Sequence, residues 1–187
     1  MRNLRLTEAN SSSALLAKTM QNGTNTDGTS KTAIVSNITL EGEISVTNTS
    51  DDIGALIGVI RGGEINTVTS MVKMTITNGA SNCIGGIVGS IHDGDQVEIL
   101  YSSNYGPITA TGAGAGGIVG SIAKNRSAST TIDHCFNGSS VLAGYTYTGT
   151  NGTNNNYYAG GIVGNINAQE NNITIQVSHC YNAGIIK

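Results

Sequence analysis

Two short phrases in this chain pair a histidine with a cysteine, the residue types that most often bind zinc. They are His134-Cys135 and His179-Cys180, which occupy equivalent positions in two sequence repeats. Two imidazoles and two thiolates are a complete ligand set for a tetrahedral Zn²⁺ ion. Neighbouring residues of a strand point to opposite faces, however, so all four side chains cannot readily converge on one ion. We therefore expect a side-chain ladder with free thiols, in preference to a zinc site or a Cys135–Cys180 disulfide.

A second group of candidate ligands is acidic. The phrase His92-Asp93-Gly94-Asp95, with Glu98 nearby, offers oxygen atoms that could bind Ca²⁺ at a turn. It lacks the run of oxygen ligands found in known calcium loops, and the other repeats do not contain it. A solvated turn is the expectation here, and no bound metal and no cofactor are predicted for the chain.

The carboxylates as a whole do not suggest catalysis. The chain has 12 acidic residues, and Asp51-Asp52, Asp93 and Asp133 lie at different positions within the repeats. Enzymes that cleave glycosidic bonds need two carboxyl groups at a defined separation across the bond. Because no register places such a pair, we expect no catalytic residues and no enzymatic activity.

Charge and hydropathy restrict the partners. The 9 basic residues are scattered singly along the chain, and the net charge is −3. Nucleic-acid binding depends on clustered Lys and Arg that neutralise phosphates, so no nucleic-acid partner is expected. No apolar run approaches the roughly 20 residues that a membrane-spanning helix needs, so no membrane insertion is expected.

The organisation of the chain is set by one short phrase that occurs four times, with glycine at its second and last positions. The last glycines of the four copies, Gly58, Gly89, Gly120 and Gly164, are 31, 31 and 44 residues apart. A fixed period with one insertion is typical of a repeat architecture, in which each unit packs mainly on its neighbours.

The segments within each repeat read as short strands. Glycine lies inside the apolar segments and no long period of 3.6 residues occurs, which disfavours amphipathic helices. Three strands and three corners in about 31 residues are typical of one coil of a parallel β-helix. We therefore predict an all-β fold, a right-handed parallel β-helix (β-solenoid) of about four three-stranded coils.

The ends of this solenoid and its one insertion can also be placed. Residues 1–33 differ from the rest: Ser11, Ser12 and Ser13 could cap a helix over residues 14–20, which predicts a short N-terminal helical cap. The β-solenoid repeats are then expected over residues 34–187. Residues 144–158, rich in Asn, Gly and Thr, predict a polar loop that accounts for the longer spacing.

Alternation along the phrase divides its apolar residues between two faces. Ile87, Ile118 and Ile162 should form an inward column. The other face should form an apolar stripe on the outer surface, which either contacts another subunit or is covered by the N-terminal segment or the long loop. The edge of the last coil should also be covered, because an open edge exposes unpaired backbone groups. The candidate interface residues are Ile57, Val88, Val119, Val163, Ile185 and Ile186.

The repeated phrase resembles the GLUG motif of bacterial surface proteins, with isoleucine in the leucine position. The matching copies are Gly86-Ile87-Val88-Gly89, Gly117-Ile118-Val119-Gly120 and Gly161-Ile162-Val163-Gly164, and Ala55-Leu56-Ile57-Gly58 is a degenerate copy. The phrases His134-Cys135-Phe136-Asn137 and His179-Cys180-Tyr181-Asn182 are similar to the phrase that follows the motif in that family. The resemblance implies a surface-exposed β-solenoid, as in adhesins, filamentous-haemagglutinin-like proteins and the non-catalytic part of some immunoglobulin-A proteases.

Two functions follow as hypotheses. The first is an extracellular or cell-surface structural module, a fibre or surface-layer subunit that self-associates through solenoid contacts or continues a longer solenoid. The alternative is an adhesin-type binding module for a carbohydrate or host-surface ligand, which would use the loop at residues 144–158. The two hypotheses differ in oligomeric state, because the first predicts filaments and the second predicts dispersed monomers.

Overall fold

The computed structural model of the chain describes residues 1–7, 13–47, 52–77, 82–124, 128–144, 158–168 and 173–187. Within these ranges the fold is all-β and contains no helix, which confirms the predicted fold class at this level. The strands form an eleven-stranded sheet (A), a four-stranded sheet (B), a five-stranded sheet (C) and a two-stranded sheet (D). Most of the predicted loop at residues 144–158 lies outside the described residues.

Sheets B and C each take one short strand from each of the four copies of the glycine phrase, and sheet C has one further strand before them; all of their pairings are parallel. Sheet C contains, in spatial order, β2 (Ala17–Met20), β7 (Ile57–Ile60), β10 (Val88–Ile91), β15 (Val119–Lys124) and β20 (Val163–Ala168). Sheet B contains β6 (Ile53–Gly54), β9 (Asn82–Gly85), β14 (Ala113–Gly116) and β19 (Ala159–Gly160).

Sheet A is also parallel and collects the remaining strands of each repeat, whereas sheet D is a small antiparallel pair. The first strands of sheet A are β1 (Leu4–Leu6), β5 (Ile34–Thr47) and β8 (Gly63–Thr77). The next repeats contribute β11 (Val97–Leu100), β12 (Ser103–Asn104), β13 (Ile108–Thr111), β16 (Thr130–Asp133), β17 (Phe136–Asn137), β18 (Val141–Gly144), β21 (Ile175–Ser178) and β22 (Tyr181–Asn182). Sheet D contains β3 (Gly23–Thr24) and β4 (Ser30–Lys31).

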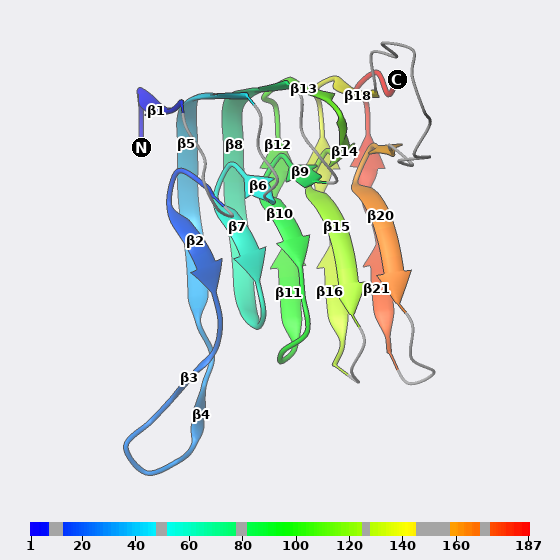
Figure 1. Cartoon of the computed structure of the whole chain (residues 1–187). Coiled ribbons are helices and arrows are strands. Elements are labelled where there is room, and N and C mark those ends of the chain that lie inside the picture. The colour runs from blue at the N-terminus through cyan, green and yellow to red at the C-terminus, as the bar shows by residue number, and fades with distance from the viewer. Residues whose placement is uncertain (8–12, 48–51, 78–81, 125–127, 145–157, 169–172) are drawn as a thin grey trace.

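Equivalent positions of successive repeats lie side by side. Ile57 pairs with Val88, Val88 with Val119, and Val119 with Val163, so the spacing seen in the sequence is the register of the sheet. The repeats accordingly form a row from the N-terminal to the C-terminal end of the molecule (Figure 1). Stacked, mostly parallel sheets of this kind are consistent with a β-solenoid-like fold.

The predicted helical cap is wrong. Residues 17–20, the second half of the expected helix, are strand β2, which pairs in parallel with β7. Its backbone bonds to that neighbour: Ala17 N–H donates to the Leu56 carbonyl at 3.2 Å, and Arg61 N–H donates to the Met20 carbonyl at 2.8 Å. A helix would have satisfied only its own backbone and left the edge of β7 unpaired, so pairing outweighs the local helix signal.

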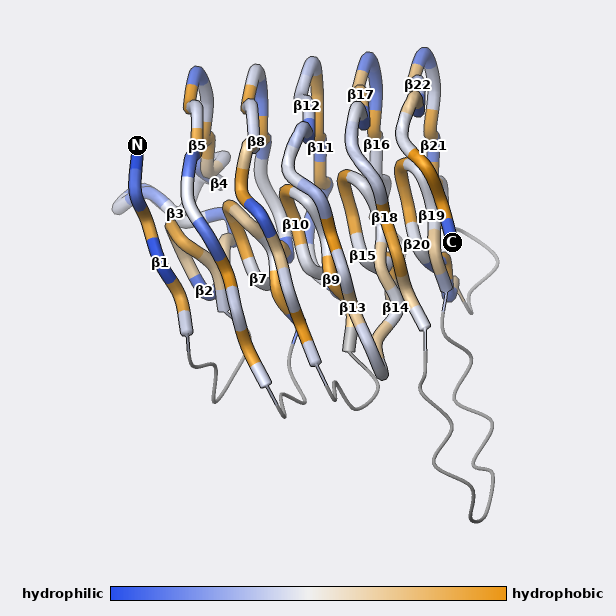
Figure 2. Tube along the Cα trace, turned by 90° about the horizontal axis from the view of Figure 1, so that it is seen from above, coloured by the Kyte–Doolittle hydropathy of each residue, from blue (hydrophilic) through white to orange (hydrophobic). Residues whose placement is uncertain are grey.

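The core is built from apolar columns that run through the repeats. Ile87 and Ile118 are fully buried, and Ile162 packs against the same core from the last repeat. Their backbones also stack, because Ile87 N–H donates to the Ile118 carbonyl at 3.0 Å and Ile118 N–H donates to the Ile162 carbonyl at 2.9 Å. The predicted burial of this column is therefore confirmed. Figure 2 shows its general form, with apolar segments at the same place in successive repeats.

The other apolar column of the phrase is not exposed. Ile57, Val88 and Val119 are at most 1% exposed, and Val163 is partly buried. All four belong to or pack on the hydrophobic core. The expectation of a stripe on the outer surface is wrong because both faces of these strands are covered: every residue of β10, whichever way its side chain points, is buried.

Glycine makes this double burial possible by letting the backbones of sheets B and C approach. A Cβ atom on Gly85, in sheet B, would overlap the Val88 carbonyl of sheet C. A Cβ atom on Gly120, in sheet C, would lie 2.5 Å from the Gly89 carbonyl oxygen and 2.7 Å from the Ile84 nitrogen. Both neighbours are backbone atoms that cannot turn aside. The repeated glycines are therefore required by the close contact between the two sheets.

This contact predicts the effect of adding one methyl group. The substitution Gly120→Ala should lower the free energy of unfolding by about 1–3 kcal/mol, because the sheets must separate to admit the Cβ. Gly114→Ala is the matched control from the same repeat, since a Cβ there would lie at an ordinary 3.5 Å from the Tyr158 ring. Urea unfolding of both variants tests the idea, and equal stabilities would contradict the close-contact role of Gly120.

Candidate functional site

The surface with the most varied chemistry is the corner that follows strands β11, β16 and β21. The residue after each strand is Tyr101, His134 or His179, with φ of 48°, 52° and 49° respectively. The equivalent residues of the first two repeats, Asn37 and Thr67, have φ of 55° and 56°. L-residues other than Asn, Asp and His rarely adopt this left-handed conformation. Its recurrence in five repeats shows that the turn requires it, whatever the side chain.

The rings that project from this corner stack on one another. The centroids of Tyr101 and His134 are 5.0 Å apart with planes at 31°. Those of His134 and His179 are 4.7 Å apart with planes at 24°. The three rings thus form a continuous stack across three repeats, in which His134 lies between the other two.

A second row of rings runs beside the first. Phe136 lies between Tyr105 and Tyr181, with centroid separations of 5.6 Å and 5.7 Å. The outer rings are well exposed, Tyr105 at 51% and Tyr181 at 65%. We call the two rows together the ring ladder, and its members are Tyr101, Tyr105, His134, Phe136, His179 and Tyr181.

Asp133 bonds to both histidines of the ladder. Its Oδ2 lies 2.7 Å from His134 Nδ1, and its Oδ1 lies 2.8 Å from His179 Nδ1. Ser178, its partner on the next strand, donates its hydroxyl to Oδ1 at 2.7 Å. The hydrogen bond from His179, then that from Ser178, hold the pKa of Asp133 well below its usual range. The group at this corner is therefore an ionised carboxylate that bridges two imidazoles.

Behind the ring ladder, the inward side of the corner holds a row of asparagines. Asn104 Nδ2 donates to Asn137 Oδ1 at 2.9 Å, and Asn137 Nδ2 donates to Asn182 Oδ1 at 2.7 Å. Each Nδ2 also donates to the carbonyl two residues further along its own chain, at 2.8–2.9 Å. Asn104 and Asn137 are fully buried, yet these bonds satisfy their side-chain amides. This row fixes the turn from which the rings project.

The cysteines face inward, away from the histidines. Cys135 is 1% exposed, and all three cysteines are free thiols, as expected. Burial raises the pKa of Cys83 and of Cys135 to about 12, and it also raises the pKa of Cys180. Reactive and metal-binding cysteines need an accessible thiolate, which these environments disfavour. The structure therefore brings His134 and His179 together without the cysteines beside them.

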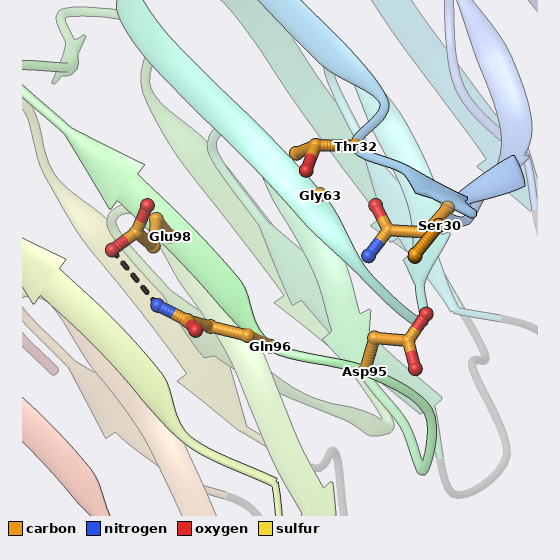
Figure 3. A pocket seen from close by; sticks show the side chains of 7 residues that line it. Ser30, Thr32, Gly63, Asp95, Gln96 and Glu98 are labelled. Carbon is orange, nitrogen blue, oxygen red and sulfur yellow. Dashed lines mark hydrogen bonds between the residues drawn. The ribbon is translucent and has the colours of Figure 1, made fainter.

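The acidic turn considered for calcium has a basic neighbour. Arg61 donates from its guanidinium to the Asp93 carbonyl at 3.2 Å, and it lines a shallow hollow together with Asp93 and Asp95. This charge opposes a second cation at the same place. Glu98 does not join the cluster: in Figure 3 it lies across a pocket from Asp95 and accepts a hydrogen bond from Gln96 at 3.0 Å.

That pocket is open and polar. Its volume is about 310 Å³. Ligand sites for drug-sized molecules are mostly apolar and enclosed, with few polar groups, so its lining does not favour such a ligand. The residues around it are Asn22, Ser30, Thr32, Gly63, Asp95, Gln96 and Glu98.

A serine, a histidine and an aspartate also meet, in an arrangement that the sequence did not suggest. The Oδ2 atom of Asp52 accepts a hydrogen bond from the Ser90 hydroxyl and lies 3.2 Å from His92 Nε2. The carboxylate therefore lies between the other two, whereas nucleophilic catalysis needs the histidine in that position. Ser90 is 1% exposed and cannot reach a substrate. This trio joins two repeats and is structural.

The two candidate interface residues at the end of the chain have different environments. Ile185 is 62% exposed. Ile186 packs against the core and forms a parallel bridge with Val141. Of the predicted interface residues, Ile185 is thus the one whose side chain is mostly free to contact another molecule.

Comparisons with known proteins do not assign this chain to a family. No protein-family model, no curated protein and no solved structure matches the chain. The part of the chain that the structure describes contains no helix long and apolar enough to cross a membrane. The resemblance to the GLUG motif stays a prediction from the sequence.

The Asp52 trio predicts a specific dependence of stability on pH. Burial disfavours the charge of Asp52, but hydrogen bonds from His92 and Ser90 outweigh it and hold the pKa of Asp52 below its usual value. The stabilisation should be complete above the unfolded-state pKa of about 3.9 and should be lost as the pH falls through the lower folded-state value. The variant Asp52→Asn should lower the free energy of unfolding at pH 7 by about 1–3 kcal/mol.

The measurement is urea unfolding of both proteins between pH 7 and pH 2. The difference between them should shrink as the pH falls below about 3.9, because the unfolded chain then binds a proton at Asp52 before the folded chain does. A difference that does not change with pH would show that the charge of Asp52 contributes nothing.

Proposed function

We propose that this chain is a structural module of an extracellular or cell-surface assembly, a right-handed parallel β-solenoid whose copies join end to end. The observation that supports this most directly is the apolar surface of the last repeat. Ile166 is 49% exposed and Val177 is 42% exposed. The residues one repeat earlier in the same columns, Ile122 and Ile132, are completely buried. Among the described residues, the last repeat therefore presents core-type side chains that no further layer covers.

The opposite end of the row carries complementary features. Among the described strands, β2 pairs only with β7, and the first half of β5 pairs only with β8. Met1 bonds to the Thr39 carbonyl and to the Glu41 N–H on the outer side of β5, so the unpaired strand edge at this end consists of β2 and the start of β5. Leu16 and Ile34, near these two strands, are 37% and 61% exposed. Figures 1 and 2 place the two ends on opposite sides of the molecule.

A second copy of the chain is the occupant that fits both ends. The strands of sheet C run in one direction from β2 to β20, so β2 of a second copy can continue the sheet beyond β20 in the same parallel sense. Open edge strands with apolar side chains favour such pairing. Because a head-to-tail contact does not use the same surface twice, it propagates into a filament.

The variant Ile166→Lys/Val177→Lys tests this assembly. It should remain folded but sediment as a monomer at protein concentrations where the unchanged chain forms larger species, because two charges would be placed in the contact. Met71→Lys is the matched control: Met71 is 45% exposed but lies on β8, in the middle of sheet A. Sedimentation velocity and electron microscopy give the readout, and a dispersed monomer for the unchanged chain at all concentrations would overturn the proposal.

The ring ladder favours a second candidate function, a binding module for carbohydrate. Its exposed rings form a surface on which the apolar face of a sugar ring can stack, and tyrosine hydroxyls supply polar contacts at the edge. Isolated exposed aromatic side chains would need no explanation, but rows that continue across three repeats suit an extended chain of sugars. The predicted contribution of the loop at residues 144–158 lies mostly outside the described residues.

A glycan array separates this candidate from the first. If the ladder binds carbohydrate, Tyr181→Ala should lose at least about fivefold in affinity, since each aromatic stacking contact contributes on the order of 1 kcal/mol or more. Tyr158→Ala is the control, because Tyr158 is 38% exposed but lies beside sheet B. Equal loss in the two variants, or no bound glycan, would remove the ladder as a sugar site.

A further inference from the structure

We propose that Asp133, His134 and His179 form a binding site for a divalent first-row transition-metal ion such as Zn²⁺. The three residues come from two repeats, and register brings them together: Asp133 ends β16, Ser178 lies opposite it on β21, and a histidine follows each. One candidate ligand atom from each of the three lies within 4.8 Å of the other two. Among the residues that the structure describes, these three are the only His, Cys, Asp or Glu residues that form a group this close together.

The donor set determines which metal the site would take. Two imidazole nitrogens and one carboxylate oxygen suit Zn²⁺, Ni²⁺ or Cu²⁺, whereas Ca²⁺ and Mg²⁺ prefer oxygen ligands alone. Three protein ligands leave further positions for water on an exposed surface. His134 and His179 have side chains that are 47% and 69% exposed, so an ion can reach them from solvent.

The ligand atoms must move and the imidazole rings must tilt to admit the ion. With metal–ligand bonds of about 2.0–2.1 Å, the ligand atoms of a tetrahedral site lie about 3.3 Å apart. The two pairs of Asp133 with the histidines now lie 2.7 and 2.8 Å apart, at hydrogen-bond distance. The two bonds use different carboxylate oxygens, Oδ2 to His134 and Oδ1 to His179, and the two rings lie nearly parallel, at 24°. Exchanging the shared protons for one metal ion therefore requires each pair to open by about half an ångström and the two rings to tilt, so that both Nδ1 lone pairs point at the ion.

The proton balance of this exchange is simple. Without metal, each Nδ1 that donates to the Asp133 carboxylate carries a proton. On binding, the Nδ1 lone pair forms the bond to the metal, and the imidazole keeps a single proton on Nε2. A doubly protonated ring releases one proton to solvent, and a neutral ring transfers its proton from Nδ1 to Nε2 through water. The exposure of both rings leaves water available at Nε2.

The surroundings hold the ligands in place. His134 lies between Tyr101 of the preceding repeat and His179 of the following one, with ring centroids 5.0 and 4.7 Å away, which restricts rotation of the middle ring. The Ser178 hydroxyl bonds to Asp133 Oδ1 and can keep the carboxylate oriented after the metal has replaced its other partners. Such outer contacts to ligand groups are a regular feature of metal sites.

This site differs from the arrangement weighed on sequence grounds. Histidine and cysteine are neighbours in each turn and point to opposite sides, so Cys135 faces the core and bonds to the Ile99 and Asp133 carbonyls instead. Asp133 takes the place of the thiols because it precedes His134 at the turn. The sequence indicates neither a His/Cys zinc site nor a calcium turn, and its repeats do not link Asp133 to the two histidines.

The test uses the purified full chain, stripped of metal by a chelator and titrated with Zn²⁺. The chain has 3 histidines, so NMR of the imidazole groups reports on each of them. His134 and His179 should shift with one equivalent of Zn²⁺, and His92 should not. Ca²⁺ at the same concentration should shift none of them.

Variants then assign the ligands by calorimetry. His134→Asn, His179→Asn and Asp133→Asn should each weaken Zn²⁺ binding at least tenfold. Asparagine suits the two histidine positions, because Asn37 already occupies the equivalent left-handed position in an earlier repeat, so the fold should be retained. His92→Asn should bind Zn²⁺ as the unchanged chain does.

Two results would overturn the proposal. One is the absence of saturable Zn²⁺ binding to the unchanged chain. The other is binding that survives the histidine substitutions and is abolished by Cys135→Ser/Cys180→Ser, which would place the ion on the thiols. Circular dichroism of each metal-free variant verifies that loss of binding does not reflect loss of fold.

Discussion

The structure depends on the in-register pairing of equivalent residues in successive repeats. In a parallel sheet each residue lies about 4.8 Å from its equivalent in the next strand, so whatever one repeat places at a position must be compatible with the same position on either side. Apolar residues then form continuous columns, such as Ile65, Ile99 and Ile132, which are all fully buried. The same rule explains why the glycines recur: where two sheets come into contact in one repeat, they do so in the next.

Register also makes polar residues acceptable in the core. A single buried asparagine would leave part of its amide unsatisfied, at a cost of about 1–3 kcal/mol. Stacked asparagines donate to one another and to the carbonyl of their own turn, so Asn137 is fully buried and hydrogen-bonded on both sides. The Ser102 hydroxyl is also hydrogen-bonded in the core: it accepts from the Val68 N–H and donates to the Leu100 carbonyl. Hydrogen bonds of these buried side chains thus help to hold the corner in its left-handed backbone conformation.

These relations explain which features could be predicted from the sequence. The period of the glycine phrase matches the register of the sheets, and Ile87 and Ile118 are buried in the core as predicted. The helix expected over residues 14–20 failed because helix signals are local, whereas the unpaired edge of β7 is a tertiary feature. Alternation also predicted that Val88 lies on an outer surface. The pattern of a single strand does not reveal that β10 is buried on both faces, or that the glycines bring sheets B and C into close contact.

The corner that contains His134 and His179 shows more clearly what could not be predicted from the sequence. The phrases that contain His134 and His179 were visible as repeats, and with Tyr101-Ser102-Ser103-Asn104 they form one aligned series. Asp133 was not linked to them, because its equivalent in the next repeat is Ser178 and no pattern is repeated at that position. Yet this difference creates the cluster: two stacked aspartates would repel each other, whereas serine donates to the single carboxylate and leaves it to both imidazoles. In a stack of similar repeats, a cluster of different functional groups therefore forms where neighbouring repeats have different residues at equivalent positions. Because the ligands come from the last two repeats, an ion bound there would also stabilise the pairing of the exposed final repeat with the one before it.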